Sequence, residues 1–319
     1  MKLSALSIAK YIHGAVRIEN VNGYLNFHRF SSNQEELIEG QNAVWYTRTK
    51  ETASIKFIAK TDATAVEVEY KLIGVSAPDT VEGYANGKLC FLTNLKNLAP
   101  VGKKGTLTLT FPQGEKEIEI LLPPNANFAI RSITANGYIH KAKERKVKAL
   151  WLGDSITQGY GALQSGEQYV EVVNRLMNYE AINQGLGGHI HDENMVVAPQ
   201  NFTPDILFIA YGTNHYLAPD FEERVVKFYE KVAKTFADIP TVVITPLWRN
   251  DVKDDIESLR NSGEIIKKVA SQYPNIKVFD GLEIVPNFNE YFLDGLHPNA
   301  LGMRVYGYEL ARKIKQLKF

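Results

Sequence analysis

The sequence predicts two domains of different fold class, an all-β domain followed by an α/β domain. Up to about residue 140, short runs alternate apolar with polar or charged residues, which is the period of a strand with one buried face. After residue 147, near-continuous apolar runs alternate with stretches of helical period, which is typical of a parallel sheet covered on both faces. Because 319 residues exceed the size of most single domains, we place the domains at residues 1–143 and 144–319.

The N-terminal domain is predicted from short strands that are separated by turn signals. Proline and glycine occur together at residues 99–102 and 111–114, and two prolines precede an asparagine at residues 123–125, between the alternating runs. Many short strands with such punctuation favour an antiparallel sandwich of the jelly-roll kind. The predicted strands are Ala15–Glu19, Ser54–Ile58, Ala65–Tyr70, Gly105–Phe111 and Glu117–Leu121.

The change of pattern falls in a polar, basic stretch at residues 141–148, which we interpret as a solvated boundary. Because no aromatic residue is interleaved with these charges, a nucleic-acid-binding patch is not indicated. The predicted strands of the second domain are Val147–Leu152, Glu180–Gln184, Asp205–Tyr211, Thr241–Thr245 and Ile276–Phe279. The predicted helices are Tyr169–Met177, Phe221–Phe236, Asp254–Ser271 and Leu301–Leu317.

Charge and cysteine content narrow the classes of function. The chain holds 36 basic and 36 acidic residues, so it offers no electrostatic reason to expect nucleic acid or an anionic membrane surface. The single cysteine, Cys90, cannot form an internal disulfide and is expected to be a packed, inert thiol. Since no convincing signal peptide or membrane span is found either, we expect a cytoplasmic protein that binds no membrane.

Ser155 is the first candidate functional residue. It follows the apolar run 147–152 and the pair Gly153-Asp154, so it stands at the carboxyl end of a buried strand. Open α/β sheets bind their ligands at that edge, and a helix that starts nearby offers free N–H groups to an anion. An isolated Asp-Ser pair would more simply cap a helix.

Three further blocks show that Ser155 is not isolated. The four blocks, in chain order, are Gly153-Asp-Ser-Ile-Thr157, Asn183-Gln-Gly-Leu-Gly-Gly188, Tyr211-Gly-Thr-Asn214 and Asp294-Gly-Leu-His-Pro298. Together they resemble the blocks of GDSL-type esterases, the SGNH hydrolases. The resemblance covers roughly residues 147–319 and implies a flavodoxin-like three-layer α/β/α domain with a parallel sheet. An all-β domain ahead of it is similar in arrangement to two-domain carbohydrate esterases with an N-terminal jelly roll.

The blocks also predict roles for individual residues. Ser155 needs a base in order to act as a nucleophile, which His297 can supply, and Asp294 can hold the tautomer of that histidine. The resemblance implies an oxyanion hole made of the Ser155 N–H, the Gly188 N–H and the Asn214 side chain. Gly187 stays open as an alternative donor, because the two glycines are adjacent.

Several nearby residues are weaker candidates. Asp154, His215 and Trp248 are tentative substrate-binding residues, and His215 stands where the family usually has an aspartate. The residues 189–193 include two histidines and two acidic residues, yet they lack the helical spacing of a zinc site. We therefore predict no metal and no cofactor.

The resulting prediction is a serine-dependent carboxylic ester hydrolase that acts on short acyl esters and deacetylates a carbohydrate. Its partner would be a small-molecule or oligosaccharide ester, and the sequence does not predict the oligomeric state. One alternative is a thioesterase or lysophospholipase of the same superfamily. The other is a catalytically idle protein whose β domain binds glycan.

Overall fold

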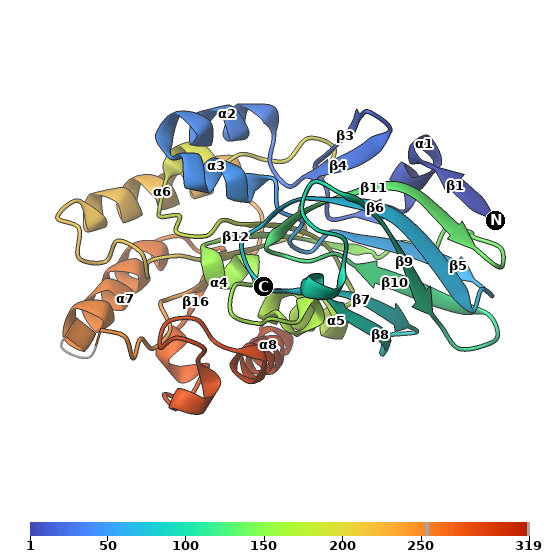
Figure 1. The fold of residues 1–319 in the computed structure, drawn as a ribbon. Helices are drawn as coiled ribbons and strands as arrows, with labels where there is room; N and C mark the ends of the chain where they lie inside the picture. The colour runs from blue at the N-terminus through green and yellow to red at the C-terminus, as the bar shows by residue number, and fades with distance from the viewer. Residues whose placement is uncertain (253–254, 318–319) are drawn as a thin grey trace.

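The computed structural model describes residues 1–252 and 255–317 (Figure 1). Its N-terminal part is a sandwich of two antiparallel sheets, with strand orders β3-β4-β11-β6-β9 and β2-β5-β10-β7-β8, and β1 also pairs with β11. The strands of the first sheet are β1 (Lys2–Ser4), β3 (Arg17–Val21), β4 (Tyr24–His28), β6 (Ala65–Val75), β9 (Lys104–Thr110) and β11 (Ala126–Ala135). Those of the second are β2 (Ile12–His13), β5 (Lys56–Thr61), β7 (Thr80–Ala85), β8 (Lys88–Asn94) and β10 (Lys116–Leu121).

The sandwich follows from the alternation in the sequence. Along β6 and β9 buried and more exposed residues alternate, so one face of each strand enters the core between the sheets. Phe57 and Ile118 enter this core from one sheet, and Tyr70 and Phe128 enter it from the other. Each of the five predicted strands overlaps an observed strand, so the predicted fold class of this domain is confirmed.

Two features of the N-terminal domain differ from the prediction. Residues 32–49 form two helices, α2 (Ser32–Gln41) and α3 (Ala43–Thr49), within a region predicted as β. Cys90 is exposed rather than packed, because it lies on β8, the edge strand of its sheet.

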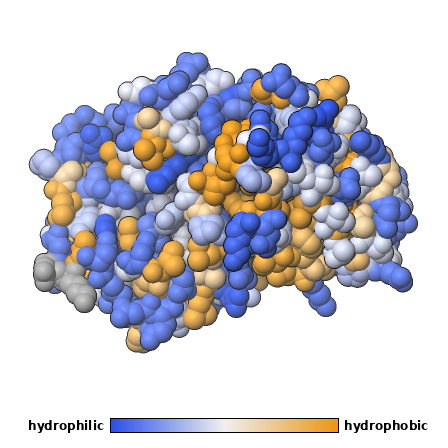
Figure 2. All heavy atoms as spheres, viewed as in Figure 1, coloured by the Kyte–Doolittle hydropathy of each residue, from blue (hydrophilic) through white to orange (hydrophobic). Residues whose placement is uncertain are grey.

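Figure 2 shows hydrophilic residues over most of the face of the molecule seen in Figure 1, with apolar residues gathered toward its middle.

The second domain is built on a parallel sheet with strand order β13-β12-β14-β15-β16, the order of flavodoxin-like folds. Its strands are β12 (Val147–Gly153), β13 (Tyr179–Gly185), β14 (Ile206–Ala210), β15 (Thr241–Ile244) and β16 (Ile276–Phe279). Its main helices are α5 (Tyr169–Met177), α6 (Phe221–Thr235), α7 (Ile256–Ala270) and α8 (Ala300–Lys315). Residue 254, predicted as the start of a helix, lies outside the described residues, and the observed α7 begins at Ile256.

The helices cover both faces of this sheet. Side chains of α5 and α8 pack with Trp151 and Phe208 on one face, whereas α6 and α7 pack with Leu150 and Leu207 on the other. The predicted three-layer α/β/α domain is therefore confirmed. From β12 the chain first adds β13 on one side and then β14, β15 and β16 on the other, so the strand order reverses at β12. Ser155 follows the carboxyl end of that strand.

Helices α2 and α3 extend the N-terminal domain over the α/β domain (Figure 1). A capping box of Ser31 and Gln34 starts α2. Ile38 of α2 packs with Leu186 and Met195, which belong to the second half of the chain. This contact brings the segment that follows α2 next to the carboxyl edge of the parallel sheet.

Candidate active site

Ser155 begins a single helical turn, α4 (Ser155–Gln158), directly after β12. A Cβ atom at Gly153 would collide with Thr157 and with the carbonyl of Ala210, so the strand can end in this tight turn only with glycine. The carboxylate of Asp154 accepts the N–H of Ile156 at 3.0 Å and caps the turn. Ser155 is thereby held at the sheet edge with a side chain that is buried but reaches a cavity.

A line of hydrogen bonds connects the serine to the last block. The Oγ of Ser155 lies 2.9 Å from Nε2 of His297, and Nδ1 of that ring lies 2.8 Å from Oδ2 of Asp294. The other oxygen of Asp294 accepts the backbone N–H groups of Leu296 and His297 at 3.1 and 2.8 Å. Residues separated by about 140 positions in the chain thus form one connected group.

The carboxylate of this group is stabilised in its charged form. Partial burial acts to raise the pKa of Asp294, but the hydrogen bonds from the backbone and ring of His297 outweigh it, and the pKa lies below its usual range. Asp294 is therefore ionised at neutral pH. A charged carboxylate on Nδ1 favours the tautomer that leaves Nε2 free to accept a proton from Ser155.

The predicted oxyanion donors gather beside the serine. The N–H groups of Ser155 and Gly188 make no hydrogen bond within residues 1–252 and 255–317. In contrast, the N–H of Gly187 donates to Oε1 of Gln158 at 2.7 Å. Gly188 has a φ of 82°, a conformation that favours glycine. The amide of Asn214 donates one hydrogen to the carbonyl of His189 at 2.9 Å, which leaves its second hydrogen for a ligand.

These groups line one cavity of about 230 Å³. Its lining residues are Arg48, Asn125, Ser155, Gln158, Tyr160, Gly187, Gly188, Asn214, Asp294, Leu296 and His297. The ring of Tyr160 meets that of His297 edge-on, with centroids 4.6 Å apart. Arg48 and Asn125 come from the N-terminal domain, and the sequence analysis missed both, because nothing in their local sequence signals a contact with Ser155.

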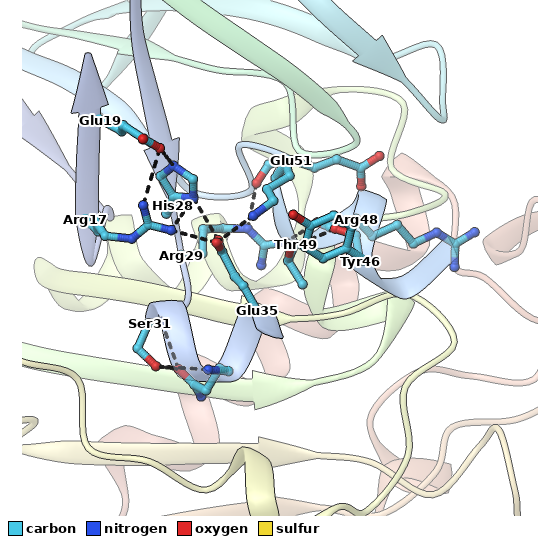
Figure 3. A network of polar contacts seen from close by, with 12 residues as sticks. Arg17, Glu19, His28, Arg29, Ser31, Glu35, Tyr46, Arg48, Thr49 and Glu51 are labelled. Atoms are coloured by element: carbon cyan, nitrogen blue, oxygen red, sulfur yellow. Dashed lines mark hydrogen bonds and ion pairs between the residues drawn. The ribbon is translucent and has the colours of Figure 1, made fainter. Parts of the chain in front are cut away.

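Arg29 lies in a network of polar contacts of the N-terminal domain (Figure 3) and also reaches residues 183–185, which precede the predicted oxyanion donor Gly188. Its side chain is fully buried and donates to carbonyls on both sides of the domain junction. The acceptors are the carbonyls of Glu51, Asn183 and Gly185, each at 2.7 Å, and of Arg48 at 3.0 Å. Burial lowers the pKa of Arg29 to about 10, so the guanidinium still carries its charge at neutral pH.

A second connection runs through Gln158. Its amide nitrogen donates to the carboxylate of Glu51 and to Oδ1 of Asn125, the latter at 3.1 Å. Its oxygen accepts the N–H of Gly187, as described above. The N-terminal domain therefore holds, through one glutamine, the turn that presents the Gly188 N–H.

The three tentative substrate-binding residues do not line this cavity. Asp154 is buried beneath α4, and burial raises its pKa to about 7. Trp248 donates its indole N–H to the carbonyl of Leu282 at 2.8 Å and packs against the core. His215 packs at a tilted angle against other rings, those of His191 and Phe221. Trp248 follows the end of β15, and its side chain points toward the core, a direction that the sequence did not reveal.

His189, His191 and His215 form a cluster in which no ring nitrogen has a hydrogen-bond partner in the described parts of the chain. Burial lowers the pKa of His189 and His215 to about 4 and holds that of His191 well below its ordinary value, so all three are neutral at pH 7. The described residues contain no group of three His, Cys, Asp or Glu side chains that could hold a metal ion. His215 thus occupies the usual aspartate position as a packing residue.

Comparison with known proteins identifies the family of the second domain. Residues 151–305 match the GDSL-like Lipase/Acylhydrolase family. The chain therefore carries a GDSL-like lipase/acylhydrolase domain, which follows a β-sandwich domain. No curated protein sequence matches the chain. Within the described residues, no helix is both long and apolar enough to cross a membrane.

Solved structures share the two-domain fold over nearly the whole chain. The salicylyl-acyltransferase of a tetracycline biosynthetic pathway is similar with a TM-score of 0.82 and 18% identity, covering 99% of this chain and 96% of its own. A Bacteroides ovatus protein described as a GDSL-like lipase gives 0.79 and 19%, covering 100% and 99%. An acetyl xylan esterase of the rumen bacterium Butyrivibrio proteoclasticus gives 0.66 and 11%, covering 99% and 97%. At these identities the likeness concerns the fold alone.

Proposed function

We propose that this protein is a serine-dependent carboxylic ester hydrolase that acts on short acyl esters. The observation that carries the proposal is the hydrogen-bonded line from Ser155 through His297 to Asp294, which opens into a cavity with unused N–H donors. Nucleophile, base and orienting carboxylate in this geometry are the parts that acyl transfer requires. A catalytically idle glycan-binding protein would not need them to be connected.

In the proposed reaction, Oγ of Ser155 attacks the ester carbonyl while its proton passes to Nε2 of His297. The oxyanion accepts hydrogen bonds from the N–H groups of Ser155 and Gly188 and from the Asn214 amide, each typically worth ~3 kcal/mol in the barrier. His297 then protonates the departing alcohol, which leaves an acyl-enzyme. Water, deprotonated by His297, attacks the acyl carbon and releases the acid, and the serine regains its proton.

The favoured substrate is an O-acetylated carbohydrate. A cavity of about 230 Å³ is smaller than most sites for drug-sized ligands, which suits a short acyl group. The similar fold of an acetyl xylan esterase supports a sugar as the alcohol. A thioesterase or lysophospholipase would use the same first step with a different leaving group or a longer acyl chain. Balanced charge and a single cysteine support a small ester as partner and a cytoplasmic location.

The test compares wild type with Ser155→Ala on an aryl acetate and on a panel of acetylated sugars. We expect the variant to lose at least 10³-fold in kcat while its melting temperature stays within a few degrees, because only the nucleophile is removed. Ser4→Ala, which changes an exposed serine on β1, is the matched control. A serine-directed phosphonate should label Ser155, as shown by mass spectrometry. Retention of more than a few per cent of kcat in Ser155→Ala would refute the nucleophile assignment.

A further inference from the structure

Arg48 stands in the wall of the active-site cavity without a role in the proposed reaction. It lies near the end of α3, and its backbone carbonyl accepts Nη2 of the buried Arg29 at 3.0 Å, which fixes the position of its backbone. Its guanidinium lies over the turn at Gly187 and Gly188, the oxyanion turn. A Cβ atom built on Gly187 would lie 2.6 Å from Nη1 of Arg48. Figure 3 shows the side chain extending away from Arg29 and Glu51.

The guanidinium of Arg48 has no acceptor among residues 1–252 and 255–317, unlike the cations around it. Arg17 and Lys50 both pair with Glu35, at 2.6 and 2.5 Å. The carboxylate of Glu51 interacts electrostatically with Arg48, but it accepts its hydrogen bonds from Ser76 and Gln158. The carboxylate that does line the cavity, that of Asp294, is engaged by His297.

A second donor lies beside Gly188, although its residue is not one of those that line the cavity. A Cβ atom built on Gly188 would lie 2.9 Å from Nε1 of Trp45, and this indole N–H has no acceptor in the described part of the chain. The Trp45 ring is held edge-on against His189, with centroids 5.0 Å apart. Two side chains of the N-terminal domain thus face the oxyanion turn, the guanidinium of Arg48 and the indole N–H of Trp45. Both groups can donate hydrogen bonds but cannot accept them.

A partly buried guanidinium loses solvation, and an anion bound in its fork restores that loss. Carboxylates and phosphates match the two parallel N–H groups of arginine. We propose that Arg48 binds an anionic group of the substrate, a carboxylate or phosphate that lies a few atoms from the scissile carbonyl. This inference rests on the proposed ester hydrolysis and specifies its substrate class: an ester that carries a negative charge on its acyl or its alcohol part.

The experiment uses pairs of esters that differ mainly in charge. On the acyl side, 4-nitrophenyl butyrate is compared with the mono-4-nitrophenyl ester of succinic acid. On the alcohol side, phenyl acetate and methyl 4-acetoxybenzoate are compared with 4-acetoxyphenyl phosphate and 4-acetoxybenzoate. The variants are Arg48→Met, Arg48→Lys and, as the matched control, Arg131→Met, whose arginine lies on β11 outside the cavity.

We expect wild type to favour the anionic member of at least one pair by tenfold or more in kcat/KM. Arg48→Met should lose at least 30-fold on that anionic ester, mainly through KM, and change less than threefold on its neutral partner. Arg48→Lys should fall between, because it keeps the charge without the fork, and Arg131→Met should behave as wild type. An equal loss on neutral and anionic esters would mean that Arg48 serves the oxyanion or the fold, and would overturn the inference. A wild type without charge preference would overturn it too.

A binding measurement separates this inference from the proposed reaction. Calorimetric titration of Ser155→Ala and of Ser155→Ala/Arg48→Met with 4-acetoxybenzoate, 4-acetoxyphenyl phosphate and monomethyl succinate needs no turnover. At least tenfold weaker binding of one of these anions in the double variant supports the inference even if Ser155→Ala remains active, in which case only the nucleophile assignment fails. Equal binding of all three by both variants contradicts the inference, whatever the esterase assays show. Melting temperatures of the Arg48 variants confirm that they are folded.

Discussion

The two walls of the cavity are built in different ways. The wall from the α/β domain consists of short sequence blocks at the carboxyl ends of parallel strands, and it holds Ser155, His297 and Asp294. The wall from the N-terminal domain comes from the segment between β4 and β5 and holds Arg48 through a buried arginine and a short helix. In the proposed function, the first wall supplies the nucleophile, the base and the carboxylate for acyl transfer. The second controls the position of the oxyanion turn and, in our proposal, the choice of substrate.

The domains are joined by buried polar contacts as well as apolar ones. Nζ of Lys56 lies 2.8 Å from the carboxylate of Glu171, and both side chains are buried. Their mutual attraction outweighs the cost of burial, so the pKa of Lys56 lies above its usual value and that of Glu171 below. Hydrogen bonds depend on direction, so these contacts and those of Arg29 specify one orientation of the domains more strictly than apolar contacts would.

Removing the base should have the largest effect and tests the first wall. His297→Ala should lower kcat at least 10³-fold. Asp294→Asn should be costly as well, because an amide can favour the wrong imidazole tautomer; the equivalent change in a serine protease lowers kcat ~10⁴-fold. Since the Asp294 side chain is 44% exposed, we expect a smaller loss here, roughly 10- to 10³-fold. Steady-state kinetics on an aryl acetate measure both. An unimpaired Asp294→Asn enzyme would show that backbone contacts alone orient the histidine.

Arg29→Met is the matching test of the second wall. It leaves three buried carbonyls and one partly buried carbonyl without their donor, so we expect the free energy of unfolding to fall by about 3 kcal/mol. Because Asn183 and Gly185 precede the oxyanion turn, kcat should also fall, by roughly tenfold or more. Urea unfolding and kinetics on the neutral ester are measured together, with Arg131→Met as the control. If stability falls while kcat is unchanged, the second wall supports the fold without positioning the site.

The histidine cluster adjoins both walls and predicts a dependence of stability on pH. The pKa values of His189 and His215 lie at about 4 in the folded protein, below the ordinary value of 6.5, because burial disfavours the charged ring. The unfolded chain therefore binds more protons between these values, and stability falls as the pH drops from about 6.5 toward 4. Urea unfolding at pH 7.5, 6 and 5 measures this slope. His191→Phe should reduce it, whereas His140→Gln, at an exposed site, should leave it unchanged.

The acyl-length series has the smallest expected effect. The cavity of about 230 Å³ is lined mainly by polar side chains and glycines, so added methylenes would find little apolar surface and gain little of the ~0.8 kcal/mol per CH₂ that burial provides. Aryl acetate should exceed aryl octanoate in kcat/KM by roughly tenfold. A steady rise with chain length would favour the lysophospholipase alternative and would mean that the second wall opens into a longer groove.

The success of the sequence predictions depends on how local the signal is. The five predicted strands of the parallel sheet are present, and the helix predicted at 169–177 is present with the same bounds. Residues 32–41 were not recognised as helical, because this helix contains few apolar residues and buries only Ile38 among them. Trp248 was placed correctly at the end of a strand, but its direction depends on the packing around it.

The sequence by itself determined the two fold classes, the order of the strands and main helices of the second domain, and the candidates Ser155, Asp294 and His297. These features depend on periodicity and on blocks of adjacent residues, which the chain carries whether or not it is folded. Only the tertiary structure decided that Arg29 reaches Gly185, that Gln158 engages Gly187 and that Arg48 enters the cavity. Arg29 and Gly185 are 156 positions apart, and no local pattern encodes a contact over that distance. Such contacts arise only when the cores of both domains have formed and bring these segments together.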